Sequence, residues 1–303
     1  MSAFAALLFL LALPAGSQTG TLHERASYLR LQVLLDRAHF SPGEIDGVPG
    51  ENTRRALRAF RAVHGVHESS DLGPRTLKAL DGSAAIPTLV RYTVTEEDIR
   101  GPFVAIPKDL MAQAALPSLS YQSPLEALAE RFHVKPALLS RLNPGKDLSS
   151  PGVEIQVPNV RQDPPAKAAK IVVSKSRNTL EAFNAAGRVV AEYPVTSGSQ
   201  HDPLPIGNWK VTVISPHPVF HYNPDLFWNA SEADEKAKIQ PGPNNPVGVV
   251  WIGISKEHYG IHGTPEPSLI GHAESHGCVR LTNWDAAELA KIVTVGTPVV
   301  FKE

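Results

Sequence analysis

The chain has 303 residues, of which 42% are hydrophobic, and its 29 basic and 30 acidic residues leave a formal net charge of −1. This length allows two or three domains of about 100–150 residues each. The balanced charge provides no basic surface for nucleic acid, so we expect no nucleic-acid partner.

The N-terminus carries an apolar run typical of a secretory signal peptide. Residues 4–13 are all apolar, and Ala15-Gly16-Ser17 offers a cleavage site of small residues, although no Lys or Arg precedes the run. The run is too short to span a bilayer. We expect residues 1–19 to be a signal peptide, the chain to be exported to the periplasm or cell wall, and no stable membrane span. The alternative is a buried N-terminal helix.

Residues 22–82 predict a small all-α domain of three helices. The segments YLRLQVLLDRAHF and ENTRRALRAFRAVHG place apolar residues at helical spacing, and the second ends at Gly65. Between them, Asp46-Gly47 suits a turn with positive φ. GPRTLKAL then places Pro74 in the first turn of a third helix.

This pattern resembles the three-helix peptidoglycan-binding domain found on many cell-wall enzymes. The matching positions are mostly core and turn residues: Leu31, Gln32, Leu35, Pro42, Gly43, Ile45, Asp46, Gly47, Gly50, Thr53, Ala56, Leu57 and Phe60. The resemblance implies this fold and a peptidoglycan partner. The alternative is a helical bundle that binds no ligand.

Residues 90–160 predict a small α+β module with an insertion. A strand-like RYTVT is followed by two short amphipathic helices and a second strand, EIQVP, an order that resembles the LysM module, a glycan binder. The matching residues are Leu125, Leu128, Ala129, Phe132, Leu139, Leu142, Asn143, Pro144, Gly152, Ile155, Val157 and Pro158. Residues 100–120 stand where that family has a short turn. Residues 161–169, RQDPPAKAA, are typical of a linker.

Residues 170–302 change to short strands rich in Val, Leu, Phe and Tyr, which predict a mostly β domain of sandwich or barrel type. One segment, NWDAAELAKIV, predicts a helix with Thr282 or Asn283 as its N-cap. The domain also contains Cys278, the single cysteine of the chain. A lone cysteine is either a small buried hydrophobic residue or a reactive thiol. The residues around it indicate which of the two roles applies.

The residues around Cys278 provide what a cysteine nucleophile needs: a base, a group that orients the base, and donors for an oxyanion. His262 is a candidate base, and the carbonyl of Gly263 could fix its tautomer. The N–H groups around Gly277 and Cys278 could bind the oxyanion. Arg280 could pair with a substrate carboxylate. The sequence lacks HExxH and a second cysteine, so we expect no metal site.

The run IHGT, followed a dozen residues later by SHGCVRLTNWD, is similar to the signature of the L,D-transpeptidase catalytic domain. The resemblance covers residues 170–302 and implies a peptidoglycan enzyme without a cofactor, whose donor and acceptor are stem peptides. It implies Cys278 as nucleophile and His262 as proton acceptor and donor. It also implies a group of oxyanion and substrate-binding residues: Gly263, Ser275, His276, Gly277 and Arg280.

The implied reaction releases D-alanine from a stem tetrapeptide, passes through a cysteine thioester and forms a 3→3 cross-link. Carbapenem-type inhibitors acylate such a thiol in this family. Alternatives on the same fold are an L,D-carboxypeptidase, in which water resolves the thioester, and a transpeptidase that attaches lipoprotein. A non-catalytic wall-binding protein is a further alternative. We also expect a chain that starts near Lys170 to be acylated, because it carries the whole signature.

Overall fold

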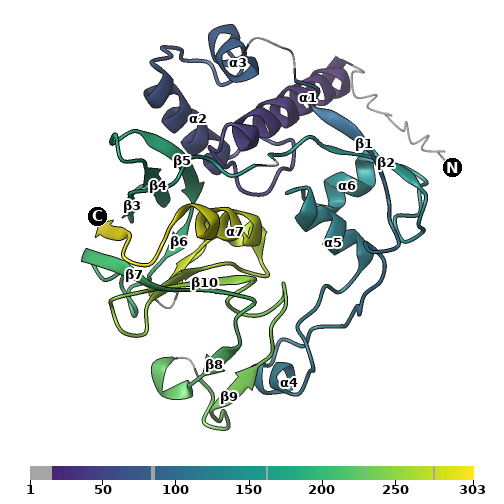
Figure 1. The fold of residues 1–303 in the computed structure, drawn as a ribbon. Coiled ribbons are helices and arrows are strands. Elements are labelled where there is room, and N and C mark those ends of the chain that lie inside the picture. The colour runs from purple at the N-terminus through teal and green to yellow at the C-terminus, as the bar shows by residue number, and fades with distance from the viewer. Residues whose placement is uncertain (1–15, 83–85, 162, 229, 276) are drawn as a thin grey trace, which may run out of the picture.

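The computed structural model describes residues 16–82, 86–161, 163–228, 230–275 and 277–303. Most of the predicted signal peptide and His276 lie outside these residues. In chain order the structure consists of a helical region, a small mixed module and a β-rich domain, which pack against one another (Figure 1). Within the described ranges, no helix is long and apolar enough to cross a membrane.

The helical region contains the three helices that the sequence predicts: α1 (Gly16–Arg37), α2 (Glu51–His64) and α3 (Pro74–Asp81). Helix α2 ends at Gly65, which takes the left-handed conformation (φ 64°), and Pro74 begins α3. The helices enclose a hydrophobic core: Tyr28, Leu31, Leu34, Leu35, Phe40, Ala56, Leu57, Phe60 and Leu80.

A buried amide holds the turn between α1 and α2. The Gln32 Oε1 accepts hydrogen bonds from the backbone N–H groups of Asp46 (3.2 Å) and Gly47 (2.8 Å). Its Nε2 donates to the Thr53 Oγ1 at 3.1 Å. Gly47 has φ +71°, as the Asp-Gly pair predicts. One polar side chain of α1 therefore fixes the turn and the start of α2.

The middle module has the strand–helix–helix–strand order that the sequence predicts. Strands β1 (Leu89–Thr93) and β2 (Glu154–Pro158) pair antiparallel, and α5 (Pro124–Arg131) and α6 (Pro136–Leu142) lie between them in sequence. The insertion carries a fifth element, α4 (Leu110–Ala114).

Helix α1 belongs to two cores. Leu29 and Val33, on another side of the helix from Leu31, pack with the apolar residues of the middle module. Ile45 joins the same core, and its backbone N–H donates to the carbonyl of His133 at 2.8 Å. The helical region and the middle module thus pack against each other and are not joined only by a flexible linker.

The β-rich domain is built on one sheet of nine strands, ordered β5-β4-β3-β13-β7-β10-β11-β12-β6. Its strands are β3 (Lys170–Ser174), β4 (Thr179–Phe183), β5 (Val189–Pro194), β6 (Thr196–Ser197), β7 (Gly207–Pro216), β10 (Val250–Ile254), β11 (Gly260–His262), β12 (Val279–Arg280) and β13 (Pro298–Lys302). Two pairs, β3–β13 and β11–β12, are parallel.

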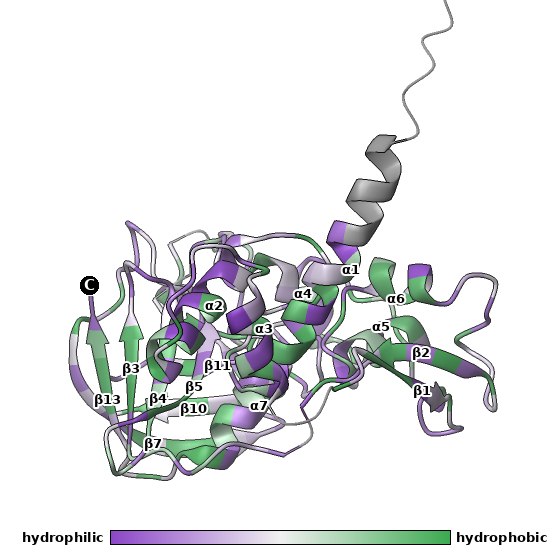
Figure 2. Cartoon of the chain, turned by 90° about the horizontal axis from the view of Figure 1, so that it is seen from above, coloured by the Kyte–Doolittle hydropathy of each residue, from purple (hydrophilic) through white to green (hydrophobic). Residues whose placement is uncertain are grey.

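The long strand β7 joins two halves of this sheet. Its first residues pair with β13 and its later residues pair with β10. The edge strands β5 and β6 are consecutive in the chain, so the sheet is curled until it is nearly closed. This arrangement agrees with the predicted mostly β domain. Strands β3 and β13 are strongly hydrophobic (Figure 2), and they contribute to a core that also includes α7 (Asn283–Ile292).

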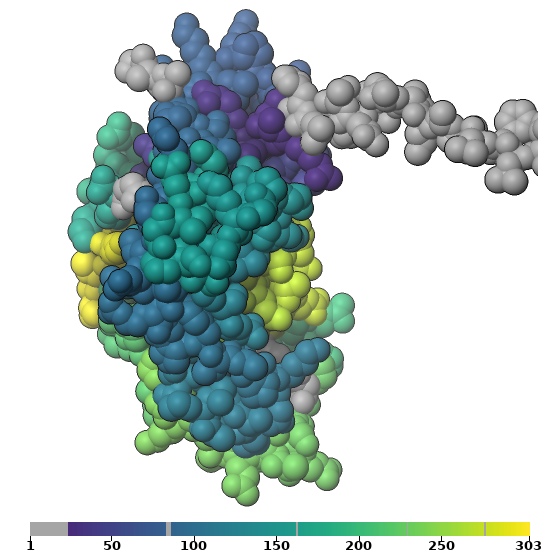
Figure 3. Space-filling view, turned by 90° about the vertical axis from the view of Figure 1, so that its right-hand side faces the viewer, coloured from purple at the N-terminus to yellow at the C-terminus, as the bar shows by residue number. Residues whose placement is uncertain are grey.

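A small hairpin projects from the β-rich domain and meets the inserted segment of the middle module. Strands β8 (Phe220–Tyr222) and β9 (Ala237–Ile239) pair antiparallel. Their side chains form a small core with Leu119, which is fully buried. Figure 3 shows the middle module running down over the β-rich domain to this hairpin.

Arg161, in the predicted linker, is buried where the three regions meet. Its guanidinium makes ion pairs with Asp36 of α1 (2.5 Å) and with Asp285 (2.5 Å) and Glu288 (2.7 Å) of α7. The Asp36 carboxylate also accepts from His133 of the middle module at 2.8 Å. The first residue of the predicted linker therefore connects the helical region to the β-rich domain through buried ion pairs.

Candidate active site

Cys278 and His262 come from neighbouring strands of the curled sheet. Strands β11 and β12 run parallel, with Ile261 opposite Val279 and His262 opposite Arg280. Cys278 directly precedes β12. Both side chains line one cavity of about 1080 Å³. The fold thus brings together two groups that are 16 positions apart in the chain.

The imidazole of His262 is fixed on two sides. Its Nδ1 lies 2.7 Å from the carbonyl oxygen of Gly263. Because a carbonyl oxygen can only accept, Nδ1 carries the proton, and Nε2 of the neutral ring keeps its lone pair. The ring of Trp251 stacks on the imidazole, with centroids 5.5 Å apart. His262 is therefore held in the tautomer that a general base requires.

The surroundings of His262 favour its neutral form. Burial and, to a smaller extent, the nearby Arg280 guanidinium lower the pKa of the imidazole to about 3, although the bond to the Gly263 carbonyl opposes both. At neutral pH the ring is therefore uncharged.

The Cys278 thiol is partly exposed to the cavity. Its Sγ donates a weak hydrogen bond to the carbonyl of His258 at 3.8 Å. Burial raises the pKa of this thiol above its ordinary value, against the opposing effects of the Gly260 N–H and the Arg280 guanidinium. At neutral pH the cavity is consequently lined by an uncharged thiol and an uncharged imidazole.

The turn before Cys278 depends on two small residues. Gly277 has φ +91°, and a methyl group in place of its hydrogen would lie 2.6 Å from the ring of Tyr259. The hydroxyl of Ser275 donates to the Cys278 carbonyl (2.6 Å) and accepts from the Gly198 N–H (2.6 Å). Ser275 is predicted to be one of the substrate-binding or oxyanion residues, and in the structure its buried hydroxyl contacts the backbone and holds this turn. His276, between them, lies outside the described residues.

Arg280 is placed to receive an anion. It lines the cavity, and in the described part of the chain its buried Nε has no hydrogen-bond partner. A buried guanidinium N–H without a partner is costly unless a ligand supplies one.

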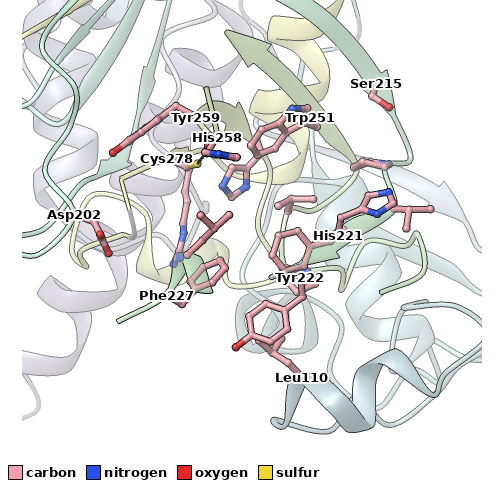
Figure 4. Close-up of a pocket in the computed structure, with 18 of the residues that line it drawn as sticks. Leu110, Asp202, Ser215, His221, Tyr222, Phe227, Trp251, His258, Tyr259 and Cys278 are labelled. Atoms are coloured by element: carbon pink, nitrogen blue, oxygen red, sulfur yellow. Dashed lines mark hydrogen bonds between the residues drawn. The ribbon is translucent and has the colours of Figure 1, made fainter. Parts of the chain in front are cut away.

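The wall opposite Cys278 comes from the hairpin and the insertion. Figure 4 shows Cys278, His258 and Tyr259 on one side of the cavity and Tyr222, Phe227 and Leu110 on another. Sequence reasoning did not identify these wall residues or Trp251. They lie in apolar runs whose pattern predicts only a strand or a loop. Folding of the chain then brings these residues to the site.

The described residues include no group of three His, Cys, Asp or Glu side chains that could hold a metal ion. Residues 168–301 match the family described as the L,D-transpeptidase catalytic domain, and residues 24–80 match the one described as "Putative peptidoglycan binding domain".

A relative from Bacillus licheniformis, named "Putative L,D-transpeptidase YkuD", is 34% identical over 177 residues, which are 58% of this chain and 91% of that protein. The chain belongs to the L,D-transpeptidase family. The protein of the same name from Bacillus subtilis is 32% identical over 176 residues, with the same coverage of each chain. "Probable L,D-transpeptidase YbiS" of Escherichia coli K12 is 31% identical over 184 residues, 59% of this chain and 60% of that protein.

Solved L,D-transpeptidase structures also resemble the chain. One from Mycobacterium smegmatis is 20% identical, with a TM-score of 0.37, and covers 50% of this chain and 64% of that one. Another, titled as LdtMt1 in complex with imipenem, is 20% identical with a TM-score of 0.34, covering 49% and 62%. The family matches and the relative from Bacillus licheniformis confirm the predicted transpeptidase and peptidoglycan-binding families, while the LysM-like character of residues 90–160 stays a prediction.

Proposed function

We propose that this L,D-transpeptidase cross-links peptidoglycan stem peptides through a thioester on Cys278. The observation that carries the proposal is the pairing of a thiol and a neutral, tautomer-fixed imidazole in one cavity. Cys278 is the nucleophile and His262 is the group that moves the proton. Membership of the family supports the reaction class.

In the first half-reaction, the Cys278 sulfur attacks the carbonyl of residue 3 of a donor tetrapeptide. The thiol proton passes to Nε2 of His262. The bond from that carbonyl to the nitrogen of D-alanine breaks, and His262 returns the proton to the departing amine. D-alanine leaves and a thioester remains. Backbone N–H groups around Gly277 and Cys278 stabilise the oxyanion that forms in between.

In the second half-reaction, the side-chain amine of residue 3 on another stem attacks the thioester. Its proton passes through His262 to the sulfur, the C–S bond breaks, and a 3→3 peptide bond joins the two stems. The chain is exported and acts in the periplasm or cell wall, where the domain matched at residues 24–80 holds it on the polymer. Tethering raises the local concentration of an immobile substrate.

Arg280 links substrate binding to activation of the thiol. Burial is the main cause of the low pKa of His262, and the charge of Arg280 is the second. A substrate carboxylate that pairs with Arg280 offsets that charge, so the imidazole becomes more basic when the donor is in place. The proton transfer from Cys278 is then favoured in the complex rather than in the free enzyme.

Acylation by a carbapenem tests this proposal. Imipenem should add one equivalent to the purified full chain, seen as a mass shift of the intact protein, because its strained carbonyl reacts with an activated thiol. The Cys278→Ala variant, which removes only the sulfur, should show no shift. An adduct on that variant, or none on the natural chain, would contradict the assignment of Cys278.

A further inference from the structure

The side chain of Asn283, at the first position of α7, lies between the His262 loop and the middle module. Its Nδ2 donates to both carboxylate oxygens of Glu130 (3.1 Å each) and to the carbonyl of Pro243 (3.0 Å). Its Oδ1 accepts from the backbone N–H of Val249 at 3.1 Å. Four contacts thus hold one amide in a single orientation.

This amide packs directly against the residue that orients His262. A methyl group on Gly263 would come within 2.2 Å of the Asn283 Oδ1, and one on Gly248 within 2.0 Å. The Gly263 carbonyl is the acceptor for Nδ1 of His262. Asn283 is therefore separated from the imidazole by one peptide group, and any rotation of that peptide would move the acceptor of the His262 N–H.

Glu130 reaches this point from helix α5 of the middle module, 153 positions before Asn283. It also accepts a hydrogen bond from the Tyr121 hydroxyl at 3.1 Å. Across the described ranges, no Lys or Arg forms an ion pair with Glu130. A carboxylate enclosed at an interface without a cation is a costly way to join two surfaces. The two groups that donate to it, the Tyr121 hydroxyl and the Asn283 amide, instead indicate that this carboxylate orients a neighbouring side chain.

We propose that Glu130 and Asn283 are positioning residues for His262, so that the middle module forms part of the catalytic apparatus. The inference rests on the proposed role of His262. The Glu130 carboxylate orients the Asn283 amide, the amide fixes the Gly263 peptide, and the Gly263 carbonyl holds Nδ1 of the imidazole. Without Glu130, the imidazole loses its fixed direction, and Nε2 accepts the Cys278 proton less readily. A chain that starts near Lys170 lacks Glu130, so it should be acylated more slowly than the full chain, although it carries the whole signature.

Acylation kinetics of the full chain test this proposal. Glu130→Ala should lower the rate constant at saturating imipenem by about tenfold or more, because small displacements of a catalytic group cost up to about 10²-fold. The apparent Kd for imipenem should change little, since Glu130 is not among the residues that line the cavity. Glu130→Gln keeps an acceptor for the Asn283 N–H and should restore most of the rate.

Glu126→Ala is the matched control. Glu126 lies on the same helix and accepts from Asn244 of the β-rich domain at 2.9 Å, whereas the Asn283 amide donates to Glu130 and Pro243. This variant should keep the natural acylation rate well above pH 7, where the Glu130 carboxyl is ionised in both chains. A folded Glu130→Ala variant with the natural rate, or an equal loss in Glu126→Ala, would overturn the proposal. Absence of acylation in the natural chain would instead refute the proposed function.

The pH profile keeps the proposal testable if Glu130→Ala fails to fold. Burial raises the pKa of Glu130 to about 7, with the hydrogen bonds from Asn283 and Tyr121 opposing it and Glu126 adding to it. Among the described residues, Tyr121 and Glu126 are the titratable groups that act on its pKa. The ionised carboxylate is the better acceptor, so the natural rate should rise as pH passes through about 7. This rise in rate should be absent from Glu130→Gln. The same pH profile of the acylation rate in Glu130→Gln and the natural chain would overturn the proposal.

Discussion

At the scale of residues, the chemistry depends on the fixed tautomer of His262. The Gly263 carbonyl leaves Nε2 as the lone-pair nitrogen, and burial keeps the ring neutral. These two residues are adjacent in sequence, which is why the short run IHGT was enough to predict their contact. Trp251 and Glu130 approach the site only through tertiary packing, so no local pattern could identify them.

Replacement of His262 should affect acylation far more than replacement of His272. His262→Ala removes the proton acceptor, and loss of a general base typically costs about 10²–10⁴-fold. His272 is exposed on the loop that leads to Cys278 and is not among the residues that line the cavity, so His272→Ala should stay close to the natural rate. Stopped-flow acylation of both variants measures the difference. Similar losses in both would show that His262 has no special role.

At the scale of elements, the hairpin of β8 and β9 forms a wall of the cavity and is supported by the insertion of the middle module. Leu119 is fully buried between them. The sequence indicated an insertion at residues 100–120 because the spacing of the module was broken there. It gave no sign of the contact with the hairpin, since a short helix such as α4 carries too few residues to show what it packs against.

Leu119→Ala should loosen the hairpin. Removal of a buried leucine side chain leaves a cavity and costs about 2–5 kcal/mol. Because the loss falls on a small core, amide hydrogen exchange should increase at residues 220–222 and 237–239, while strands β3 and β13 keep their protection. The exposed Leu269, replaced by Ala, serves as the control. Unchanged exchange in the hairpin would show that the insertion does not support it.

At the scale of the whole molecule, the N-terminal regions are joined to α7 by consecutive residues of that helix. Asn283 bonds to Glu130, the Trp284 ring stacks on His133 with centroids 5.1 Å apart, and Asp285 pairs with Arg161. The order of the three regions could be predicted from composition and spacing. The packing of the three regions against one another could not be predicted, because Arg161 is a charged residue in a Pro-rich stretch that is typical of an exposed linker.

Arg161→Ala should strongly destabilise the chain. It leaves three carboxylates, those of Asp36, Asp285 and Glu288, without their shared cation, and breaking a buried ion pair costs about 3–5 kcal/mol. Arg177→Ala breaks an exposed pair with Glu181 and should cost about 1 kcal/mol or less. Chemical denaturation of both variants compares them. Equal losses would mean that Arg161 does not anchor the three regions.

The same cluster predicts a pH dependence of stability. Although burial alone would raise it, Arg161 and His133 lower the pKa of Asp36 from 3.8 to about 2. A carboxyl whose pKa is lowered by folding contributes stability that is present above pH 3.8 and lost as pH falls through about 2. The natural chain should therefore lose its advantage in Tm over Asp36→Asn across this window. A constant difference in Tm would contradict the ion-pair account.

The central claim is that Cys278 carries the stem peptide as a thioester and transfers it to a second stem. Mass spectrometry of muropeptides after incubation of disaccharide-tetrapeptide with the purified chain tests it most directly. We expect free D-alanine and 3→3 linked dimers with the natural chain, and neither with Cys278→Ala. Dimers formed by the Cys278→Ala variant, or tetrapeptide left unchanged by the natural chain, would contradict it.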